Sequence, residues 1–383
     1  MARPTLTAAI AYAVVLGAVF LLTVILPAAG AFRAPLLPID SGAIREATVV
    51  AVLDERVQET PAGNVYRARL LVRVGEREAE LDHVYVEGGA DAITLAEGDG
   101  VLVSEMETAE GTVYTLKDRS RRVSLWVLSL AFALTVVAVG GRHGALSLLG
   151  LGVTFLVLVR FIVPATLDGW SPLPTTIVGA LAILGASMVL SHGPNPKTWI
   201  AIAGTAASLL LTGVLAAFAV GFARLSGVGE ESAAILQVLT QGGIDARGLL
   251  LAGIIIGALG VLDDVTTTQA STVIELRRAN PSLGTPALFA RAMNVGRDHI
   301  AATTNTLVLA YAGAALPLLL IYAGQPHPLG ILVSFDQLAT EIVRTLAGSI
   351  GIVAAVPVTT ALAAILVGSG LVSVEGDERG ADA

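Results

Sequence analysis

The sequence predicts an all-α polytopic membrane bundle of about eight transmembrane helices, with a small extracytoplasmic all-β domain inserted after the first helix. Hydrophobic residues make up 54% of the 383 positions and charged residues only 14%, whereas soluble domains carry about 25% charged residues. Mean hydropathy is +0.77. Apolar runs of about 20 residues, enough to cross a hydrocarbon core of ~30 Å, recur along the chain.

The composition also excludes several classes of function. The chain has no cysteine, which removes disulfides, thiolate metal sites and cysteine nucleophiles. It has no GxxxxGK[ST] loop for ATP. The net charge is −8, and no basic patch with interleaved aromatics favours nucleic acid. We therefore expect no cofactor, no ATP site and no nucleic-acid partner.

The first apolar run begins at Ala8 and ends at Ala29, and we interpret residues 1–31 as an uncleaved first transmembrane helix. Residues 32–122 form the one soluble domain. Its alternating or β-branched runs are separated by Gly- and Pro-containing turns, which predicts a β-barrel or sandwich. The runs are Ala47–Val52, Val65–Val74, Asp82–Val86 and Val101–Ser104.

Residues 123–374 predict a seven-helix transmembrane domain, and the polar tail 375–383 is predicted to be disordered. Within this domain, Gly227–Gly243 contains an apolar stretch that is too short to span a membrane and predicts an interfacial or re-entrant helix. The seven predicted spans are Val123–Val139, Ala145–Val163, Thr175–Leu190, Thr198–Phe222, Gly248–Glu275, Ile300–Ala323 and Leu338–Val372.

Basic residues in short loops predict the orientation, because cytoplasmic loops carry an excess of Lys and Arg. With the N-terminus cytoplasmic, the inner loops hold Arg142, Lys197, Arg277, Arg278, Arg291 and Arg297, and the outer short loops hold Arg224 and Arg247. We therefore expect a multi-pass protein of the bacterial inner membrane, with both termini cytoplasmic and residues 33–120 extracytoplasmic.

The stretch Gly248–Arg278 carries two adjacent carboxylates, Asp263 and Asp264, near the middle of a predicted span. A central Asp costs ~2.5–3.5 kcal/mol on the insertion scale. Polar residues that only hold helices together can be supplied more cheaply, so this pair favours function over packing. For Ser271, Thr303, Thr304 and Thr306, hydrogen bonds that only pack helices together remain the competing interpretation.

Helical spacing divides these polar residues between two faces. Asp264, Thr268 and Ser271 share one face, and Asp263 and Thr267 lie about 100° away.

Thr285 as N-cap and Pro286 as first residue predict the next helix, which carries Asp298 and Asn305. Its short connection to the preceding helix predicts antiparallel neighbours. At ~1.5 Å per residue, Asn305 then lies level with Thr267 and Thr268.

Together these residues predict a binding site for a small cation or proton in a cavity open to the cytoplasm. Asp264 would be the binding carboxylate, Asp263 would tune its charge, and Asp298 would guard the mouth. Thr267, Thr268 and Asn305 would supply neutral oxygens, which hard cations prefer. The candidate site residues are Asp263, Asp264, Thr267, Thr268, Ser271, Asp298 and Asn305.

Two long motifs, LGVLDDVTTTQASTVIELRRANP and GRDHIAATTNTLVLAYAGAALPLLL, together with IDARG before the first of them, resemble the YibE/F family of bacterial multispan membrane proteins. The resemblance covers nearly the whole chain and is most specific in its last third. It implies a multispan protein of the bacterial membrane and assigns no activity. Asp264 matches the acidic position of the family pattern best.

The sequence leaves three competing functions. The first is a secondary transporter of a small ion or small molecule, cation- or proton-coupled. The second is a non-catalytic membrane partner or assembly protein whose outer β domain binds another component. The third, an intramembrane aspartyl enzyme, is disfavoured because Gly260–Asp263 gives GxxD rather than GxGD, so we expect no enzyme. The lipid bilayer is one partner, and the oligomeric state, a homo-oligomer included, stays open.

Overall fold

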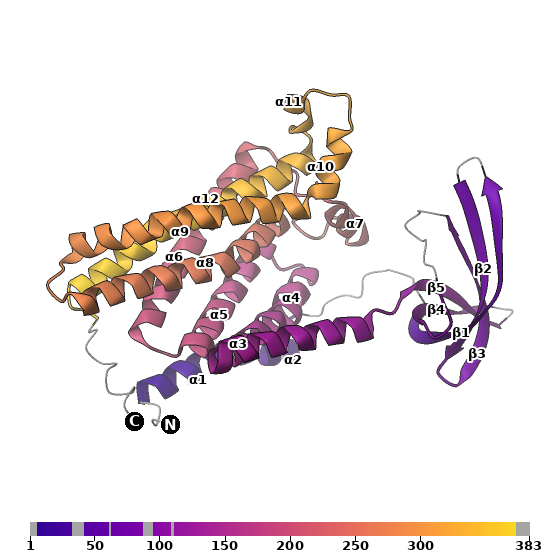
Figure 1. The fold of residues 1–383 in the computed structure, drawn as a ribbon, viewed down its shortest axis with the longest axis horizontal. Coiled ribbons are helices and arrows are strands. Elements are labelled where there is room, and N and C mark those ends of the chain that lie inside the picture. The colour runs from indigo at the N-terminus through magenta and orange to yellow at the C-terminus, as the bar shows by residue number, and fades with distance from the viewer. Residues whose placement is uncertain (1–5, 33–41, 61–62, 87–94, 109–110, 373–383) are drawn as a thin grey trace. The chain divides into compact units, whose positions relative to one another are not determined.

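The computed structural model describes residues 6–32, 42–60, 63–86, 95–108 and 111–372 (Figure 1). The chain divides into two compact units, one of residues Pro38–Val136 and one of Met1–Leu37 with Val137–Ala383. The tail 375–383, predicted to be disordered, lies outside the described residues. We describe each unit by itself.

The smaller unit contains one antiparallel five-stranded sheet, as the alternating sequence runs predict. The strand order is β3-β2-β1-β4-β5. Irregular pairing of β1 with β2 near Val49 and Val52 bends the long strand β1, and the edge strands β3 and β5 contact each other, so the sheet curls into a half-barrel. The strands are β1 (Ala43–Thr60), β2 (Gly63–Val74), β3 (Arg77–Val86), β4 (Gly100–Thr108) and β5 (Gly111–Arg119).

Alternation places one face of this sheet inward. Val49, Leu70, Val72, Val101 and Val103 come from the central strands and are at most 1% exposed.

A polar turn at Ala96–Asp99 precedes β4 in the same unit. The Asp99 carboxylate accepts a hydrogen bond from the Ala96 backbone N–H and one from the Arg119 guanidinium. These two bonds, the backbone bond first, lower the pKa of Asp99 below its ordinary value of 3.8.

The larger unit is helical, in agreement with the predicted bundle. Its helical segments are α1 (Leu6–Phe20), the π-helical turn η1 (Leu21–Ile25), α2 (Leu26–Ala28), α3 (Arg122–Val157), the π-helical turn η2 (Leu158–Ile162), α4 (Val163–Leu167), α5 (Pro172–His192), α6 (Pro196–Phe222), α7 (Glu231–Leu239), α8 (Ala246–Ala279), α9 (Thr285–Ala314), α10 (Leu316–Ala323), α11 (Leu329–Leu332) and α12 (Asp336–Gly368). Helix α3 begins in the smaller unit and continues into this one.

Six helices of the described chain are long and apolar enough to cross a membrane, or seven if the pair α9 and α10, bent by 67°, is one span. A multispan membrane protein is therefore supported, while the predicted number of eight is not reached. The difference lies in Arg122–Leu167, a single 46-residue segment where the sequence predicts two spans. Its backbone is non-helical at Gly141, with φ 55°, a conformation that glycine adopts readily.

Two further expectations need correction at α9. Gly284, not Thr285, is the N-cap residue, and Thr285 is the first residue of the helix. The helix begins at Thr285, as the Thr285-Pro286 pair predicts, but the predicted span Ile300–Ala323 is interrupted, because α9 breaks at Ala315, before Pro317. Proline has no backbone N–H and crowds the preceding turn, which explains the break.

Helices α6, α8 and α12 pack on one another, and α8 and α12 also pack on α9. Figure 1 shows α8, α9 and α12 running side by side. Glycines allow this close approach. A Cβ added at Gly204 of α6 would lie 2.5 Å from Thr359 Oγ1 of α12, and one added at Gly351 of α12 would collide with Thr212 of α6. Small residues at helix contacts are typical of membrane bundles.

Candidate functional site

Asp263 lies near the middle of α8, where this helix contacts α5. Its Oδ1 atom is buried and has no hydrogen-bond partner among the described residues. Its Oδ2 atom accepts one long hydrogen bond, 3.4 Å, from Ser187 Oγ of α5. The ion pairs of the described residues do not include Asp263. A carboxylate placed this way in a spanning helix is under-solvated, which is costly unless a cation or a proton joins it.

Thr267 is one turn further along the same face of α8, because residues i and i+4 are stacked on a helix. Its Oγ1 atom is also buried and without a hydrogen-bond partner in the described chain. Asp263 and Thr267 thus present neighbouring oxygen atoms, and Ser187 adds a hydroxyl from α5. Oxygen ligands of this kind suit a proton or a hard cation.

Asp264, expected to be the binding carboxylate, has the opposite environment. Its side chain is exposed, on a face rotated by about 100° from Asp263. The same face of α8 carries the exposed glycines Gly253, Gly257 and Gly260. The fold therefore separates the two carboxylates, and it is Asp263 that combines burial with a neighbouring helix.

Thr268 and Ser271 line a surface pocket of α8, together with Thr272, Glu275 and Leu276. The Ser271 hydroxyl donates to the Thr267 carbonyl oxygen at 2.7 Å, and the Thr272 hydroxyl donates to the Thr268 carbonyl oxygen at 2.9 Å. Such bonds satisfy hydroxyls inside a helix. Ser271 is thus held by its own helix.

Helix α9 runs antiparallel to α8, as its short connection predicts. A Cβ on Gly296 would lie 3.2 Å from the Gln269 side chain, and one on Gly257 would lie 3.2 Å from the Tyr311 hydroxyl oxygen. Counting residues along both helices between these two contacts places Asn305 at roughly the level of Asp263. The sequence had predicted the level of Thr267 and Thr268, about one helical turn away. Both Asn305 and Asp298 are exposed.

A buried polar network next to Asp263 was missed by sequence reasoning. The Thr266 and Thr205 hydroxyls lie 2.5 Å apart between α8 and α6. The Thr360 hydroxyl of α12 donates to Gln269 Oε1 at 2.9 Å, while Gln269 Nε2 has no partner in the described chain. Single hydroxyls or amides in apolar segments give no periodic signal, so only the fold reveals these pairs.

Groups of three or more His, Cys, Asp or Glu residues that could hold a metal ion do not occur in the described ranges. The oxygen-rich site at Asp263 consists of one carboxylate and two hydroxyls.

A family model described as YibE/F-like protein matches residues 128–369, more than half of the chain, including Asp263 and Ser187. A search of the curated proteins finds no match. A search of the solved structures finds none either.

Proposed function

We propose that this chain, which belongs to the YibE/F-like family, is a secondary transporter that moves or is driven by a proton or a monovalent cation. The observation that carries the proposal is the Asp263 carboxylate, whose buried Oδ1 has no partner among the described residues of a membrane-length helix. Ionisable groups inside membrane segments mark ion pathways because their burial is expensive.

Asp263 is the binding carboxylate in this proposal, in place of Asp264. The ion would be held by Asp263 and the Thr267 hydroxyl, and Ser187 would keep Asp263 turned toward α5. Asp264, one residue on and exposed, adds negative charge near the ion. Asp298 keeps its proposed place at the cytoplasmic mouth. Thr268 and Asn305, expected to be neutral oxygen ligands, would instead form a polar route on the cytoplasmic side.

Transport is favoured over hydrolysis by the neighbour of Asp263. An aspartyl hydrolase needs two carboxylates from different helices that converge on one water. Among the described residues, the side chain that hydrogen-bonds Asp263 from another helix is the Ser187 hydroxyl, which suits ion binding and not acid catalysis of this type.

We further propose eight spans, with both termini cytoplasmic and the β unit outside the inner membrane. The 46-residue segment Arg122–Leu167 would measure about 69 Å as one helix, more than twice the ~30 Å core. Division at the non-helical Gly141 gives two spans, and the bent pair α9 and α10 gives one more. The basic residues of the inner loops support this orientation.

Ion-dependent stability tests the binding step. Purified protein in detergent is heated in Na⁺, in K⁺ and in N-methylglucamine at constant ionic strength, at several pH values, and the Tm is read from tryptophan fluorescence. Ligands that bind only the folded state raise Tm, so we expect a rise with one small cation or with protons. Asp263→Asn should abolish that rise, and Glu275→Gln, at an exposed carboxylate of the same helix, should keep it. An equal rise in wild type and Asp263→Asn would remove the proposed site.

A further inference from the structure

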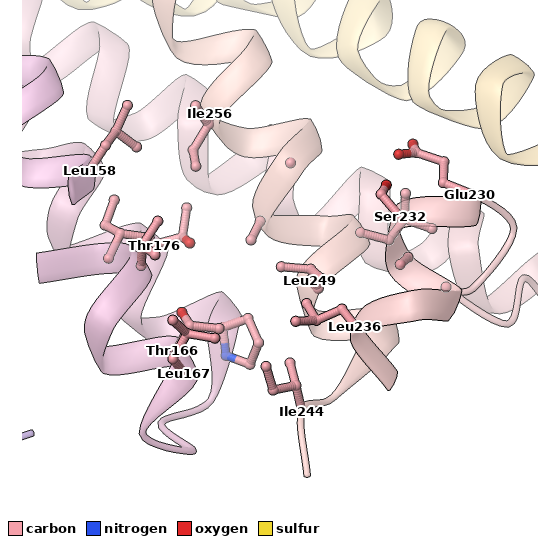
Figure 2. A pocket seen from close by; sticks show the side chains of 18 of the residues that line it. Leu158, Thr166, Leu167, Thr176, Glu230, Ser232, Leu236, Ile244, Leu249 and Ile256 are labelled. Atoms are coloured by element: carbon pink, nitrogen blue, oxygen red, sulfur yellow. The ribbon is translucent and has the colours of Figure 1, made fainter. Parts of the chain in front are cut away.

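A cavity of about 570 Å³ lies in the helical unit, between η2, α4, α5, α7, α8 and α12. Most of its lining is apolar, with Leu158, Ile162, Leu236, Leu249 and Ile256 among the wall residues. Figure 2 shows Thr176 and Leu158 on one side of the cavity and Ser232 and Leu236 on the other. This volume and this lining are those of sites that bind drug-sized organic molecules.

Three polar atoms of the wall have no partner among the described residues. They are Thr176 Oγ1 of α5, Thr340 Oγ1 of α12 and Arg344 Nε of α12. Thr176 is 0% exposed and Thr340 is 2% exposed. Buried polar groups are nearly always hydrogen-bonded in native proteins. The Thr340 hydroxyl and the Arg344 Nε lie one turn apart on α12, so together they point to a ligand with a polar end.

The charges around Arg344 limit the chemistry of that polar end. Its Nη1 donates to Glu341 at 2.8 Å, and its Nη2 contacts Glu230. Two carboxylates and one guanidinium leave an excess negative charge, which repels a carboxylate or a phosphate. Nε is a donor and requires an acceptor, and an ammonium group offers none. The remaining class is an uncharged oxygen acceptor.

We propose that this cavity binds a largely apolar molecule that carries an uncharged hydrogen-bond acceptor, a hydroxyl or a carbonyl. The acceptor oxygen takes a hydrogen bond from Arg344 Nε beside the Thr340 hydroxyl, and the apolar body fills the space between α5, α7 and α8. This binding site does not depend on ion transport through Asp263, which lies seven residues beyond Ile256, the last wall residue along α8.

The wall that α7 contributes is fixed to α12. Ser226 donates to the Asp336 carboxylate through both its backbone N–H and its hydroxyl. Gly229 packs so closely that an added Cβ would lie 2.9 Å from Thr340 Oγ1. These contacts hold the segment before α7 next to the polar end of the cavity. Glu230, the N-cap residue of α7, also forms an ion pair with Arg344.

Three photoactivatable probes with the same twelve-carbon chain test the proposal: a diazirine-bearing dodecanol, the matching dodecylammonium and the matching dodecanoate. Full-length protein in nanodiscs is irradiated with each probe, and labelled peptides are mapped by mass spectrometry with and without excess unlabelled dodecanol. We expect saturable labelling by the alcohol in α7 and in the first turns of α8, and at least fivefold less labelling by either charged probe.

Matched variants separate the cavity from general partition into lipid. Ala233→Trp fills the cavity and should lower saturable labelling at least fivefold, while Ala234→Trp, on the same helix and outside the lining, should retain it. Thr340→Val keeps the shape and removes one hydroxyl, so labelling should need about 2- to 10-fold more alcohol. Thr345→Val, whose hydroxyl bonds the Glu341 carbonyl oxygen, should behave as wild type.

Three results would overturn the proposal. One is alcohol labelling that unlabelled dodecanol does not compete, spread over the outward surfaces of many helices. Another is unchanged saturable labelling in both Ala233→Trp and Thr340→Val. The third is stronger labelling by the ammonium or the carboxylate probe, which would refute the chemical class.

Discussion

The contact between α6 and α12 makes Gly204→Ala a sharp test of the packing. An added Cβ would lie 2.5 Å from Thr359 Oγ1, 2.8 Å from its Cγ2 and 3.0 Å from its Cβ, whereas carbon atoms pack at about 3.5–4.0 Å. Rotation of Thr359 cannot move its Cβ, so the helices must separate. Overpacking of this kind costs about 1–3 kcal/mol, partly offset by the ~0.5–1 kcal/mol that alanine gains over glycine in a helix.

Gly213→Ala in the same helix is the matched control, because its Cβ would meet Ile255 Cδ1 at an ordinary 3.5 Å. We expect this variant to be neutral or stabilised by up to about 1 kcal/mol, and Gly204→Ala to be destabilised by roughly 1–2 kcal/mol.

The assay for both variants is reversible unfolding by SDS in mixed micelles, followed by tryptophan fluorescence. Thr359→Gly in the Gly204→Ala background should recover about 1 kcal/mol in a double-mutant cycle. Equal stability of the two alanine variants, with no coupling in the cycle, would refute the close α6–α12 contact.

Three further predictions concern the β unit, the buried network and the topology. The folded-state pKa of Asp99 is lowered from 3.8. The ionised Asp99 carboxylate therefore stabilises the β unit above about pH 4, and this stabilisation is lost as the pH falls through the folded-state pKa. Amide hydrogen exchange of β4 and β5 in the full chain should accelerate over that pH range in wild type, and less so in Asp99→Asn. Gln269→Leu removes a buried amide with an unpartnered Nε2 and should change the unfolding free energy by less than about 1 kcal/mol; a loss of several kcal/mol would show that the amide is essential to the core. In this cysteine-free chain, a cysteine at Glu107 should react with an impermeant thiol reagent in intact cells and one at Asn280 should not, and the reverse pattern would invert the orientation.

Length and periodicity predicted the coarse fold well, since bilayer thickness fixes the length of a span and pleating fixes the alternation of a strand. Helices α5, α6 and α8 begin and end within a few residues of the predicted spans. The start of α9 was predictable from Thr285 and Pro286, although its N-terminal half is polar and gave no apolar run. Its C-terminal end was less predictable, because the bend before Pro317 depends on how the chain continues.

The sequence predicted which segment of the chain holds the candidate site, but not how the side chains of the site are arranged in space. Sequence spacing places Asp263 and Asp264 about 100° apart, but the residues that cover each face come from elsewhere in the chain. Ser187, 76 residues from Asp263, lies in an apolar run where a serine gives no functional signal. Burial therefore distinguishes the two carboxylates only after α5 and α8 are packed together.

Flux through proteoliposomes tests the central claim most directly. Protein is reconstituted with a trapped pH indicator, and a gradient of the cation that stabilised it in detergent is imposed, with a proton gradient alone as the second condition. We expect wild type and Glu275→Gln to change the internal pH at similar rates, and Asp263→Asn to be slower by at least tenfold, since its carboxylate is the proposed binding group. Undiminished flux in a correctly folded Asp263→Asn variant would contradict the assignment of Asp263 as the ion-binding residue.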